Sequence, residues 1–593
     1  MPALTKILVA NRGEIAIRVF RTARELGIGT VAVYSEADRD RLHVAVADEA
    51  YLLGPGPASE SYLRADTIVE VALRAGVDSV HPGYGFLAEN ADFARRVEAS
   101  GLTWIGPPPE AIEAMGSKIA ARERMRAAGV PVVPGTTRPA TSVEDVLDAA
   151  AEVGYPIAVK ASGGGGGKGL RVAHAADEVE RAFETARREG EAYFADAAVY
   201  VERYLDDPRH VEVQILADSH GNVIHLGERD CTIQRRHQKL VEETPSPAVD
   251  AELRARIGGI AIAAARAVGY RSAGTVEGLL DTDGSYYFLE MNTRVQVEHT
   301  VTEVVTGIDI VREQIQVAAG EPLSVTQKEV GLRGHALECR INAEDVSRAF
   351  LPSPGRITAY REPAGIGVRV DSGVQAGDEI SELYDPMIAK LIVHDVDREH
   401  ARKRMLRALE EFVIEGPTTL LGFHRALLET TCFVEAGTCR GVVESEELAQ
   451  RAQELDRLSP QSAGIAASAD GRPAGVATRD HVVAVEIDGR RHEVRLHAAE
   501  PPWAELARRH RERSRGLVSA ATGAVTSPMQ GTVLSVAVGD GDAVSTGDLI
   551  CVVEAMKMEN EIVAHSDGIV AEFAVAAGEP VSNGQVICVI ASA

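Results

Sequence analysis

The C-terminal end of the chain contains a repeat with a period of 37 residues. Residues 531–553 align with residues 568–590, and eleven of the 23 pairs are identical, including Gly531 with Gly568. Each half ends in a strand-like apolar run, LICVV or VICVI, and has glycines at intervals typical of turns. Two equivalent halves of this kind predict an all-β flattened barrel of about 70 residues with pseudo-twofold symmetry.

The segment EAMKMENEI joins the two halves and places Lys557 between Met556 and Met558. In the predicted barrel it forms a hairpin, with Asn560 or a neighbour in the turn, so Lys557 is expected at an exposed tip. An exposed lysine is usually solvated surface, but this one lies at the symmetry point of a small rigid domain. The motif EAMKM resembles the attachment motif of biotin carboxyl carrier domains. The resemblance implies that Lys557 carries covalent biotin as a swinging arm, attached by a biotin protein ligase.

Length and charge restrict what the rest of the chain can be. Its 593 residues exceed what one hydrophobic core organises, so several domains are expected. The formal charge of -26 argues against nucleic acid or an anionic membrane as a partner. No apolar run is long enough to cross a bilayer and MPALTKILVANRGE is no secretory signal, so a cytoplasmic location is expected. The six cysteines form no CxxC pair and are predicted to be reduced, mostly packed thiols.

Strands and amphipathic helices alternate in the N-terminal part. KILVA and TVAVYS read as strands around the helix GEIAIRVFRTARELG, which is typical of a doubly wound α/β sheet. Residues 11–14 are Asn-Arg-Gly-Glu where a nicotinamide dinucleotide site would have GxGxxG, so such a site is not expected. Further on, a helix ending at Val153 precedes the predicted strands YPIAVKA, GLRVAH and AVYVERYL.

A glycine run follows Lys160 and lies between the first two of these strands. Glycines let backbone N–H groups approach a polyphosphate closely, and Lys160 and Lys168 add positive charge. The run is not a Walker A motif, and a glycine run alone is as often a linker as a site. The strand flanks and the paired lysines favour phosphate binding.

Acidic and polar residues alternate along the segment YYFLEMNTRVQVEHTVTE, which is predicted to be a strand and the chain that leaves it. The residues expected on one face are therefore Glu290, Asn292, Arg294 and Gln296. With Glu277 from the strand GTVEGLL, the oxygens of Glu290 and Asn292 suit Mg²⁺ (or Mn²⁺) held between carboxylates and substrate phosphates. The alternative is a solvated strand face with a surface ion pair.

These features together resemble the ATP-grasp biotin carboxylases from about Lys6 to Val443. The segments that carry the likeness are LVANRGEIAIR, HPGYGFLAENA, GSK, VKASGGGGGKG, RDCTIQRRHQKLVEETPSP, FLEMNTRVQVEHTVTE and GHALECRINAED. The likeness implies an α/β ATP-grasp enzyme followed by an all-β biotinyl/lipoyl-type barrel. The expected parts are a doubly wound N-terminal domain (1–117), an ATP-grasp domain (118–330) with a glycine-rich lid at about 135–203, a mixed C-terminal domain (331–446), a linker with a β-hairpin (447–525) and the biotinyl domain (526–593).

The resemblance also assigns roles to single residues. The residues expected to bind ATP are Lys118, Lys160, Gly163, Gly164, Gly165, Gly166, Gly167, Glu202, Leu205, His210, Gln234, His237, Glu277 and Glu290. Those expected to bind bicarbonate are Lys239, Arg294, Gln296 and Val297, and the metal ligands are Glu277, Glu290 and Asn292. The expected catalytic residues are Glu298, Arg340, Arg294 and Lys239, with Glu298 as the base that deprotonates bicarbonate and Arg340 as the group that stabilises the biotin ureido oxygen.

The implied reaction converts ATP and bicarbonate to carboxyphosphate, which yields CO₂ and phosphate, and the phosphate deprotonates biotin before its nitrogen is carboxylated. No room for a carboxyltransferase remains after about Val443, so the acceptor half is expected on another polypeptide. This layout resembles the α subunit of bacterial acyl-CoA carboxylases acting on acetyl-, propionyl- or methylcrotonyl-CoA. The segment VVAVEIDGRRHEVRLH, with a type I′ turn at Asp488-Gly489, is a hairpin candidate for docking the carboxyltransferase β subunit. Self-association within a larger hetero-oligomer is expected by resemblance.

Three alternatives remain open from the sequence alone. The chain could be the biotin-bearing subunit of a two-subunit pyruvate or other 2-oxoacid carboxylase. It could also be a lipoyl-type carrier fused to an unrelated ATP-dependent ligase, although lipoyl domains typically have Asp-Lys-Ala where this chain has Met-Lys-Met. A non-catalytic biotin-binding scaffold is the third.

Overall fold

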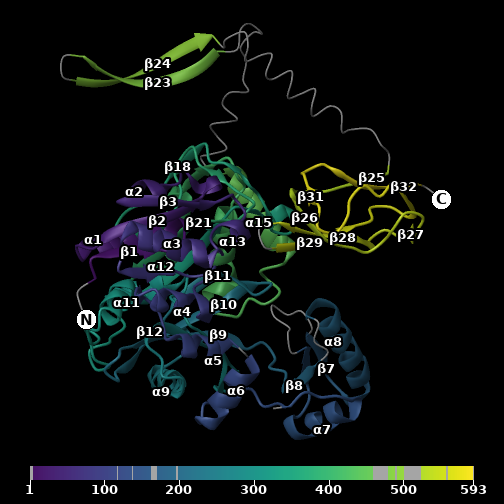
Figure 1. Ribbon diagram of the computed structural model, residues 1–593. Helices are drawn as coiled ribbons and strands as arrows, with labels where there is room; N and C mark the ends of the chain where they lie inside the picture. The colour runs from purple at the N-terminus through teal and green to yellow at the C-terminus, as the bar shows by residue number, and fades with distance from the viewer. Residues whose placement is uncertain are drawn as a thin grey trace. The chain divides into compact units, whose positions relative to one another are not determined.

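The computed structural model describes residues 4–116, 118–136, 138–161, 170–194, 198–458, 478–487, 490–499, 523–555 and 558–591. The chain forms two compact units, Met1–Ser459 and Pro460–Ala593 (Figure 1). We call the first the large unit. Within the described ranges, no helix is both long enough and apolar enough to pass through a membrane.

The N-terminal region of the large unit is a parallel five-stranded sheet in the order β3-β2-β1-β4-β5. Its strands are β1 (Lys6–Val9), β2 (Gly29–Ser35), β3 (Glu49–Gly54), β4 (Ser79–His81) and β5 (Thr103–Trp104). The helices that connect and follow them are α1 (Gly13–Glu25), α2 (Leu42–Val46), α3 (Ala65–Ala75), α4 (Ala91–Ala99), α5 (Pro109–Gly116) and α6 (Lys118–Ala127). The central strand β1 is fully buried from Ile7 to Val9, and α1 turns Ile15, Val19 and Phe20 toward the core, as its amphipathic pattern predicts.

A second, antiparallel sheet of eight strands forms the centre of the large unit, in the order β13-β12-β9-β10-β11-β14-β21-β19. The strands are β9 (Arg209–Ala217), β10 (Val223–Arg235), β11 (Gln238–Thr244), β12 (Ser272–Leu280), β13 (Tyr286–Asn292), β14 (His335–Asn342), β19 (Val368–Ser372) and β21 (Met387–Asp395). Helices α9 (Ala251–Ala267), α10 (His299–Thr306) and α12 (Arg398–Glu411) pack against it. Because β11 pairs with β14, strands before and after residue 330 share one sheet.

The glycine-rich segment belongs to a small antiparallel sheet in the order β7-β6-β8. It consists of β6 (Ile157–Ala161), β7 (Leu170–Ala173) and β8 (Val199–Arg203), with α7 (Val143–Val153) and α8 (Val179–Phe194) packed on it (Figure 1). These elements have a hydrophobic core of their own, which includes Val159, Phe183 and Val201. The predicted strand, glycine loop and strand are therefore present, while residues 162–169 lie outside the described ranges.

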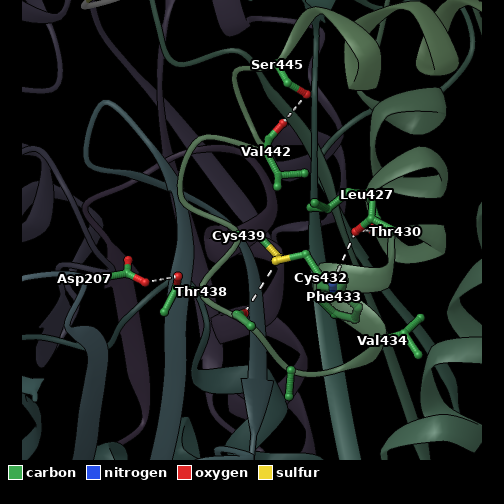
Figure 2. The surroundings of a disulfide bond; sticks show 12 residues. Asp207, Leu427, Thr430, Cys432, Phe433, Val434, Thr438, Cys439, Val442 and Ser445 are labelled. Atoms are coloured by element: carbon green, nitrogen blue, oxygen red, sulfur yellow. Dashed lines mark hydrogen bonds between the residues drawn. A yellow bond between two sulfur atoms is a disulfide. The ribbon is translucent and has the colours of Figure 1, made fainter. Parts of the chain in front are cut away.

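The expectation that every cysteine is a reduced thiol is wrong for two of them. Cys432 in α14 (Thr431–Val434) and Cys439 form a disulfide (Figure 2). The chain reverses between them because Ala436 and Cys439 adopt positive φ angles of 59° and 53°, and the Gly437 N–H donates to Cys432 O. This reversal has no short sequence motif, so counting cysteine spacings could not find it. The remaining four cysteines are free and buried.

The disulfide loop is tied to the segment that precedes β9. Thr438 Oγ1 donates to Asp207 Oδ2 at 2.6 Å, and Arg209 contacts the Ala436 carbonyl (Figure 2 shows Thr438 and Asp207). Helices α13 (Leu421–Glu429) and α15 (Glu446–Leu458), on either side of the loop, pack against each other. The cross-link therefore closes a turn that reaches from the C-terminal helices to the central sheet.

In the second unit, residues 523–591 form two four-stranded sheets, ordered β25-β32-β30-β27 and β29-β28-β26-β31. The strands are β25 (Ala524–Thr526), β26 (Gly531–Val536), β27 (Ala543–Val544), β28 (Leu549–Ala555), β29 (Met558–Val563), β30 (Gly568–Ala571), β31 (Pro580–Val581) and β32 (Val586–Ala591). We call this domain the C-terminal barrel. In the first half β26 pairs with β28 and β31, and in the second half β30 pairs with the equivalent strands β32 and β27. The predicted pseudo-twofold barrel is confirmed.

Gly531 and Gly568 occupy equivalent positions of the repeat, where the neighbouring strand leaves no space for a side chain. A Cβ on Gly531 would lie 2.3 Å from Glu554 O, and a Cβ on Gly568 would lie 2.4 Å from Ala591 O. Both carbonyls belong to the neighbouring strand at equivalent positions of the repeat. Only glycine lets the two strands approach this closely.

The prediction that Asn560 or a neighbour makes the turn of the hairpin is wrong. Asn560 lies inside β29, opposite Val553, and is 7% exposed. Ala555 pairs with Met558, so the two-residue connection is Met556-Lys557, which lies outside the described residues. The turn was misplaced because asparagine is common in turns and rare in strands, whereas here the pairing of β28 with β29 continues past Asn560.

The spacer contains the predicted hairpin. Strands β23 (Thr478–Ile487) and β24 (Arg490–Ala499) pair antiparallel, with Ile487 opposite Arg490. The predicted turn residues, Asp488 and Gly489, lie outside the described ranges.

Candidate active site

A row of charged side chains crosses four strands of the central sheet. The row consists of Arg229 on β10, Glu212 on β9, Glu277 on β12 and Glu290 on β13, each opposite the next in the strand pairing. Residues directly opposite in antiparallel strands point to the same face, so these side chains share one side of the sheet. We call these four residues the charged row. Arg229 and Glu212 have no exposed surface, and Arg229 Nε donates to Glu212 Oε1 at 2.5 Å.

Lys239, near the start of β11, links the charged row to the predicted catalytic base. Its ammonium lies 2.9 Å from Glu277 Oε1 and 2.6 Å from Glu298 Oε1, and it also contacts Glu212. Burial alone would lower the pKa of Lys239, but the charges of Glu212, Glu298 and Glu277 outweigh burial and raise it. Lys239 therefore stays positively charged and fixes the Glu298 carboxylate.

Glu298, the last residue before α10, is fully buried between two cations. Its Oε1 accepts from Lys239, and its Oε2 accepts from Arg340 Nη2 at 2.9 Å. Burial would raise the pKa of Glu298, but the charges of Lys239 and Arg340 hold it below its ordinary value. The carboxylate is therefore ionised at neutral pH and can accept a proton.

Arg340 on β14 also donates through Nε to Glu242 Oε1, at 2.6 Å. Burial raises the pKa of Glu242 to about 8, although the charge of Arg340 opposes the shift. The guanidinium thus lies between an ionised carboxylate and one that holds its proton more tightly. It faces the same site as Lys239 from the opposite side of Glu298.

Three of the four predicted bicarbonate residues lie in the segment between β13 and α10, which we call the 293–298 loop, while the fourth, Lys239, is on β11. Arg294 donates through Nη1 to Gln296 Oε1 at 3.0 Å and through Nη2 to Asn292 Oδ1 at 3.1 Å. Its Nε donates to Glu89 Oε2 at 3.0 Å, so the N-terminal region also orients it. A guanidinium and an amide beside an ionised base offer several donors to an oxyanion.

The predicted metal ligands fit a hard cation by donor type. Glu277 and Glu290 lie opposite each other on β12 and β13, and Asn292 Nδ2 donates to Glu277 Oε1 at 2.7 Å. All three offer oxygen atoms, as Mg²⁺ prefers. His210 Nε2 lies 2.8 Å from Glu277 Oε2. Among the described residues, His210, Glu212 and Glu277 also bring ligand atoms within 4.8 Å of one another.

The residues predicted to hold the nucleotide are only partly described. Lys160 on β6 pairs with Glu202 on β8, which also contacts Arg122. Leu205 is buried, and Gln234 Nε2 donates to Cys231 O at 2.7 Å. These contacts place Lys160 and Glu202 together on the small sheet. The glycines Gly163 to Gly167 and the side chain of Lys118 lie outside the described residues.

His237 occupies a tight turn beside this region. It and Arg236 connect β10 to β11, with positive φ angles of 65° and 45°, and Arg235 pairs with Gln238 on either side. Two successive residues with positive φ are the signature of a type I′ turn. The turn holds an exposed histidine two residues before Lys239.

Sequence reasoning missed several titratable groups around the site, most of them buried. The missed residues are Glu89, Arg122, Glu212, Arg229, Glu242, His299, Glu338 and Lys390. A signal was present for some of them, because Glu212 in HVEVQIL and Lys390 in MIAKLIV are single charges within apolar strands. A buried charge needs a partner, so such a residue marks a site whose partners come from elsewhere in the fold.

The chain matches four known families over most of its length. Residues 3–112 match the biotin carboxylase N-terminal domain, and residues 117–326 match the ATP-binding domain of the carbamoyl-phosphate synthase L chain. Residues 338–445 match the biotin carboxylase C-terminal domain. Residues 523–590 match the domain described as biotin-requiring enzyme.

Named relatives agree with these matches. The biotin-dependent acyl-coenzyme A carboxylase alpha3 subunit of Mycobacterium leprae is 46% identical over 580 residues, 95% of each chain. A pyruvate carboxylase subunit of Methanothermobacter thermautotrophicus is 51% identical over 480 residues, 78% of this chain and 98% of the relative. The biotin carboxylase domain of Hydrogenobacter thermophilus 2-oxoglutarate carboxylase, solved as a dimer with MgADP, ADP and bicarbonate, superposes with a TM-score of 0.70 at 46% identity and covers 75% of this chain and 99% of that one.

Proposed function

The chain belongs to the biotin carboxylases and has a biotin carrier domain of its own, and from this we propose that it supplies carboxybiotin to a separate carboxyltransferase subunit that acts on an acyl-CoA. The biotin is attached to Lys557 in this proposal. Chains of this family carboxylate biotin with ATP and bicarbonate.

One observation carries the proposal for the catalytic residues. The Glu298 carboxylate is fully buried, ionised and held between Lys239 and Arg340, beside the Arg294 and Gln296 side chains of the 293–298 loop. A buried ion cluster costs desolvation free energy, so a packed apolar core would be at least as stable. The arrangement supports a chemical role for these groups.

Bicarbonate would bind to Arg294, Gln296 and the Val297 N–H. Glu298 would take its proton, and the freed oxygen would attack the γ-phosphate of ATP. A carboxylate with a lowered pKa is a weak base in the free protein. An anion that draws Lys239 and Arg340 toward itself removes part of the charge that lowers this pKa, so substrate binding would strengthen the base.

Glu277, Glu290 and Asn292 would hold Mg²⁺, which offsets the negative charge of the ATP phosphates. Lys160 would exchange its contact with Glu202 for phosphate oxygens, and Glu202, which also contacts Arg122, would bind the adenosine end of ATP. Arg340 would stabilise negative charge on the ureido oxygen of biotin. MgADP and bicarbonate in the Hydrogenobacter structure support these assignments by likeness.

The acyl-CoA assignment is supported by the relative that matches 95% of both chains, the Mycobacterium leprae alpha3 subunit. The second candidate is the biotin-bearing subunit of a 2-oxoacid carboxylase. It is favoured by the higher identity, 51%, to the Methanothermobacter pyruvate carboxylase chain, whose match spans only 78% of this chain.

The deciding experiment is capture of the native protein on immobilised avidin, with peptide mass mapping of the modified lysine. The captured complex is then supplied with ATP and labelled bicarbonate, and with acetyl-CoA, propionyl-CoA or pyruvate in turn. Biotin on Lys557 and label in an acyl-CoA support the proposal. Label in pyruvate alone supports the second candidate, and an unmodified Lys557 overturns the carrier assignment. The variant Lys557→Arg is the matched control, since it should not bind avidin.

The β23–β24 hairpin would dock the carboxyltransferase subunit. Deletion of residues 480–515 should abolish copurification of that subunit while bicarbonate-dependent ADP release stays unchanged. Retained copurification would show that the docking element lies elsewhere. The chain would also pair with a second copy, as the Hydrogenobacter domain does.

A further inference from the structure

The 293–298 loop has three successive backbone carbonyls that accept hydrogen bonds from side chains. Val295 O accepts from Arg294 Nη1 at 3.3 Å, Gln296 O from His299 Nδ1 at 2.7 Å, and Val297 O from Lys390 Nζ at 2.9 Å. His299 opens α10, and Lys390 comes from β21, 93 residues further along the chain than Val297. Both are fully buried.

These bonds fix the orientation of two peptide planes. In a trans peptide the C=O and the N–H point in opposite directions, so holding one aims the other. His299 holds the carbonyl of the peptide between Gln296 and Val297, and it thereby aims the Val297 N–H. Lys390 holds the next carbonyl and thereby fixes the peptide that leads into Glu298.

We infer that His299 and Lys390 are positioning residues for bicarbonate. His299 aims the Val297 N–H at the anion, and Lys390 keeps the Glu298 backbone in place behind the base. The inference rests on the proposed function, because it assigns the anion site to Val297. Neither residue touches the substrate itself.

Lys390 is suited to this role because the groups around it keep it charged. Its Nζ lies 3.4 Å from Glu14 Oε2 of α1 and 3.8 Å from Asp371 Oδ2 of β19, and the Tyr84 ring lies 5.9 Å away. The carboxyl of Glu338, on β14, adds negative charge. Burial would lower the pKa of Lys390, but these carboxylates raise it. A charged donor to a carbonyl forms a stronger bond than a neutral one.

His299 is suited because it is neutral and has a single N–H. Burial, and then the charges of Lys390, Arg18 and Arg369, hold the pKa of His299 far below its ordinary value. The Gln296 carbonyl can only accept, so the imidazole proton lies on Nδ1. Its Nε2 is 3.9 Å from Glu303 Oε2 and has no hydrogen-bond partner among the described residues.

The test compares substitutions that remove or keep each donor, using bicarbonate-dependent ADP release by the full-length chain. His299→Leu removes the donor, while His299→Asn places an amide N–H where Nδ1 was. Lys390→Met is combined with Glu14→Gln, so that the lost positive charge does not leave Glu14 unpaired. The matched control is His43→Leu, since His43 is equally buried but faces Val33 O in the N-terminal sheet, at 3.4 Å.

We expect His299→Leu and the double variant to raise the bicarbonate KM about three- to tenfold, the value of one hydrogen bond, with the ATP KM within about twofold. His299→Asn should restore the bicarbonate KM. His43→Leu should lower the melting temperature but leave the bicarbonate KM unchanged. An unchanged bicarbonate KM in His299→Leu, or an equal rise in His43→Leu, overturns the inference. If the wild-type chain releases no ADP in response to bicarbonate, the proposed function is itself wrong.

Discussion

The two sheets of the C-terminal barrel and the central sheet of the large unit are all antiparallel, yet their interiors differ. Among the described residues of the barrel, the buried polar side chains are Ser527 and Asn560. The central sheet instead buries Arg229, Glu212 and Glu277 of the charged row, together with Lys390 and the carboxyl groups around Arg340. Apolar interiors stabilise a shape, whereas buried charges cost free energy and persist where chemistry needs them. Substitutions in the two regions should therefore have different effects on the protein.

The largest expected effect separates chemistry from folding. Glu298→Gln keeps the shape of the side chain but removes the carboxylate that we propose as the base, which is also a partner of Lys239 and of Arg340. Bicarbonate-dependent ADP release should fall about 10²- to 10⁴-fold, measured by a coupled assay. The proposed biotin attachment at Lys557 should be unaffected, as read by avidin blotting. A variant with near-normal ADP release would show that another group accepts the proton.

A second change tests whether buried charge costs stability in the large unit. Glu344, in β15 (Glu344–Asp345), is 2% exposed, and burial raises its pKa from 4.5 to about 7, although Asn342 and Arg235 oppose the shift. A carboxyl with a raised folded-state pKa supports folding below pH 4.5, and this support is lost as pH rises to about 7.

Glu344→Gln removes this titration. As the pH rises from 4.5 to 7.5, the unfolding free energy of the variant should increase by about 3 kcal/mol relative to that of the wild type. Calorimetry of the full chain measures it, with the transition of the C-terminal barrel as internal reference. A difference that does not depend on pH would show that Glu344 has an ordinary pKa.

How far the sequence predicts each region follows from how local its contacts are. The barrel was predictable because its strands repeat, and the Arg294, Gln296 and Glu298 cluster because these residues are neighbours in the chain. Lys390 and Glu242 were not, since they reach the site only through the pairing of β11 with β14 and of β14 with β21. A pattern of apolar residues identifies strands but does not say which strands pair.

A third, smaller effect on stability is expected from removal of the disulfide. Cys432→Ser removes a cross-link that closes a loop with a sequence separation of seven residues. The chain-entropy relation for such a short loop predicts a loss of about 2.5 kcal/mol in the large unit. Calorimetry under oxidising conditions should show it, and a dithiol reductant should produce the same loss in the wild type but none in the variant. Equal stability of all four samples would show that the cross-link is not formed in solution.

The smallest effect tests the symmetry of the barrel. Gly531→Ala and Gly568→Ala each place a methyl group against a strand carbonyl, at 2.3 Å and 2.4 Å before relaxation. Each should cost about 1–3 kcal/mol in the barrel transition, and the two costs should agree within about 0.5 kcal/mol. Gly539→Ala is the control, because its Cβ would meet only Asp542 Oδ2 at 3.9 Å. Unequal costs would show that the two halves pack differently.

The strand order of the barrel makes its two halves depend on each other. Each sheet takes a strand from the opposite half, β31 beside β26 in one and β27 beside β30 in the other. Neither half could complete a sheet by itself, so the domain is in effect a dimer whose two halves have been joined into one polypeptide. A single half would therefore need a second copy of itself to complete either sheet, and the segment that contains Lys557 is the covalent bridge between the two halves.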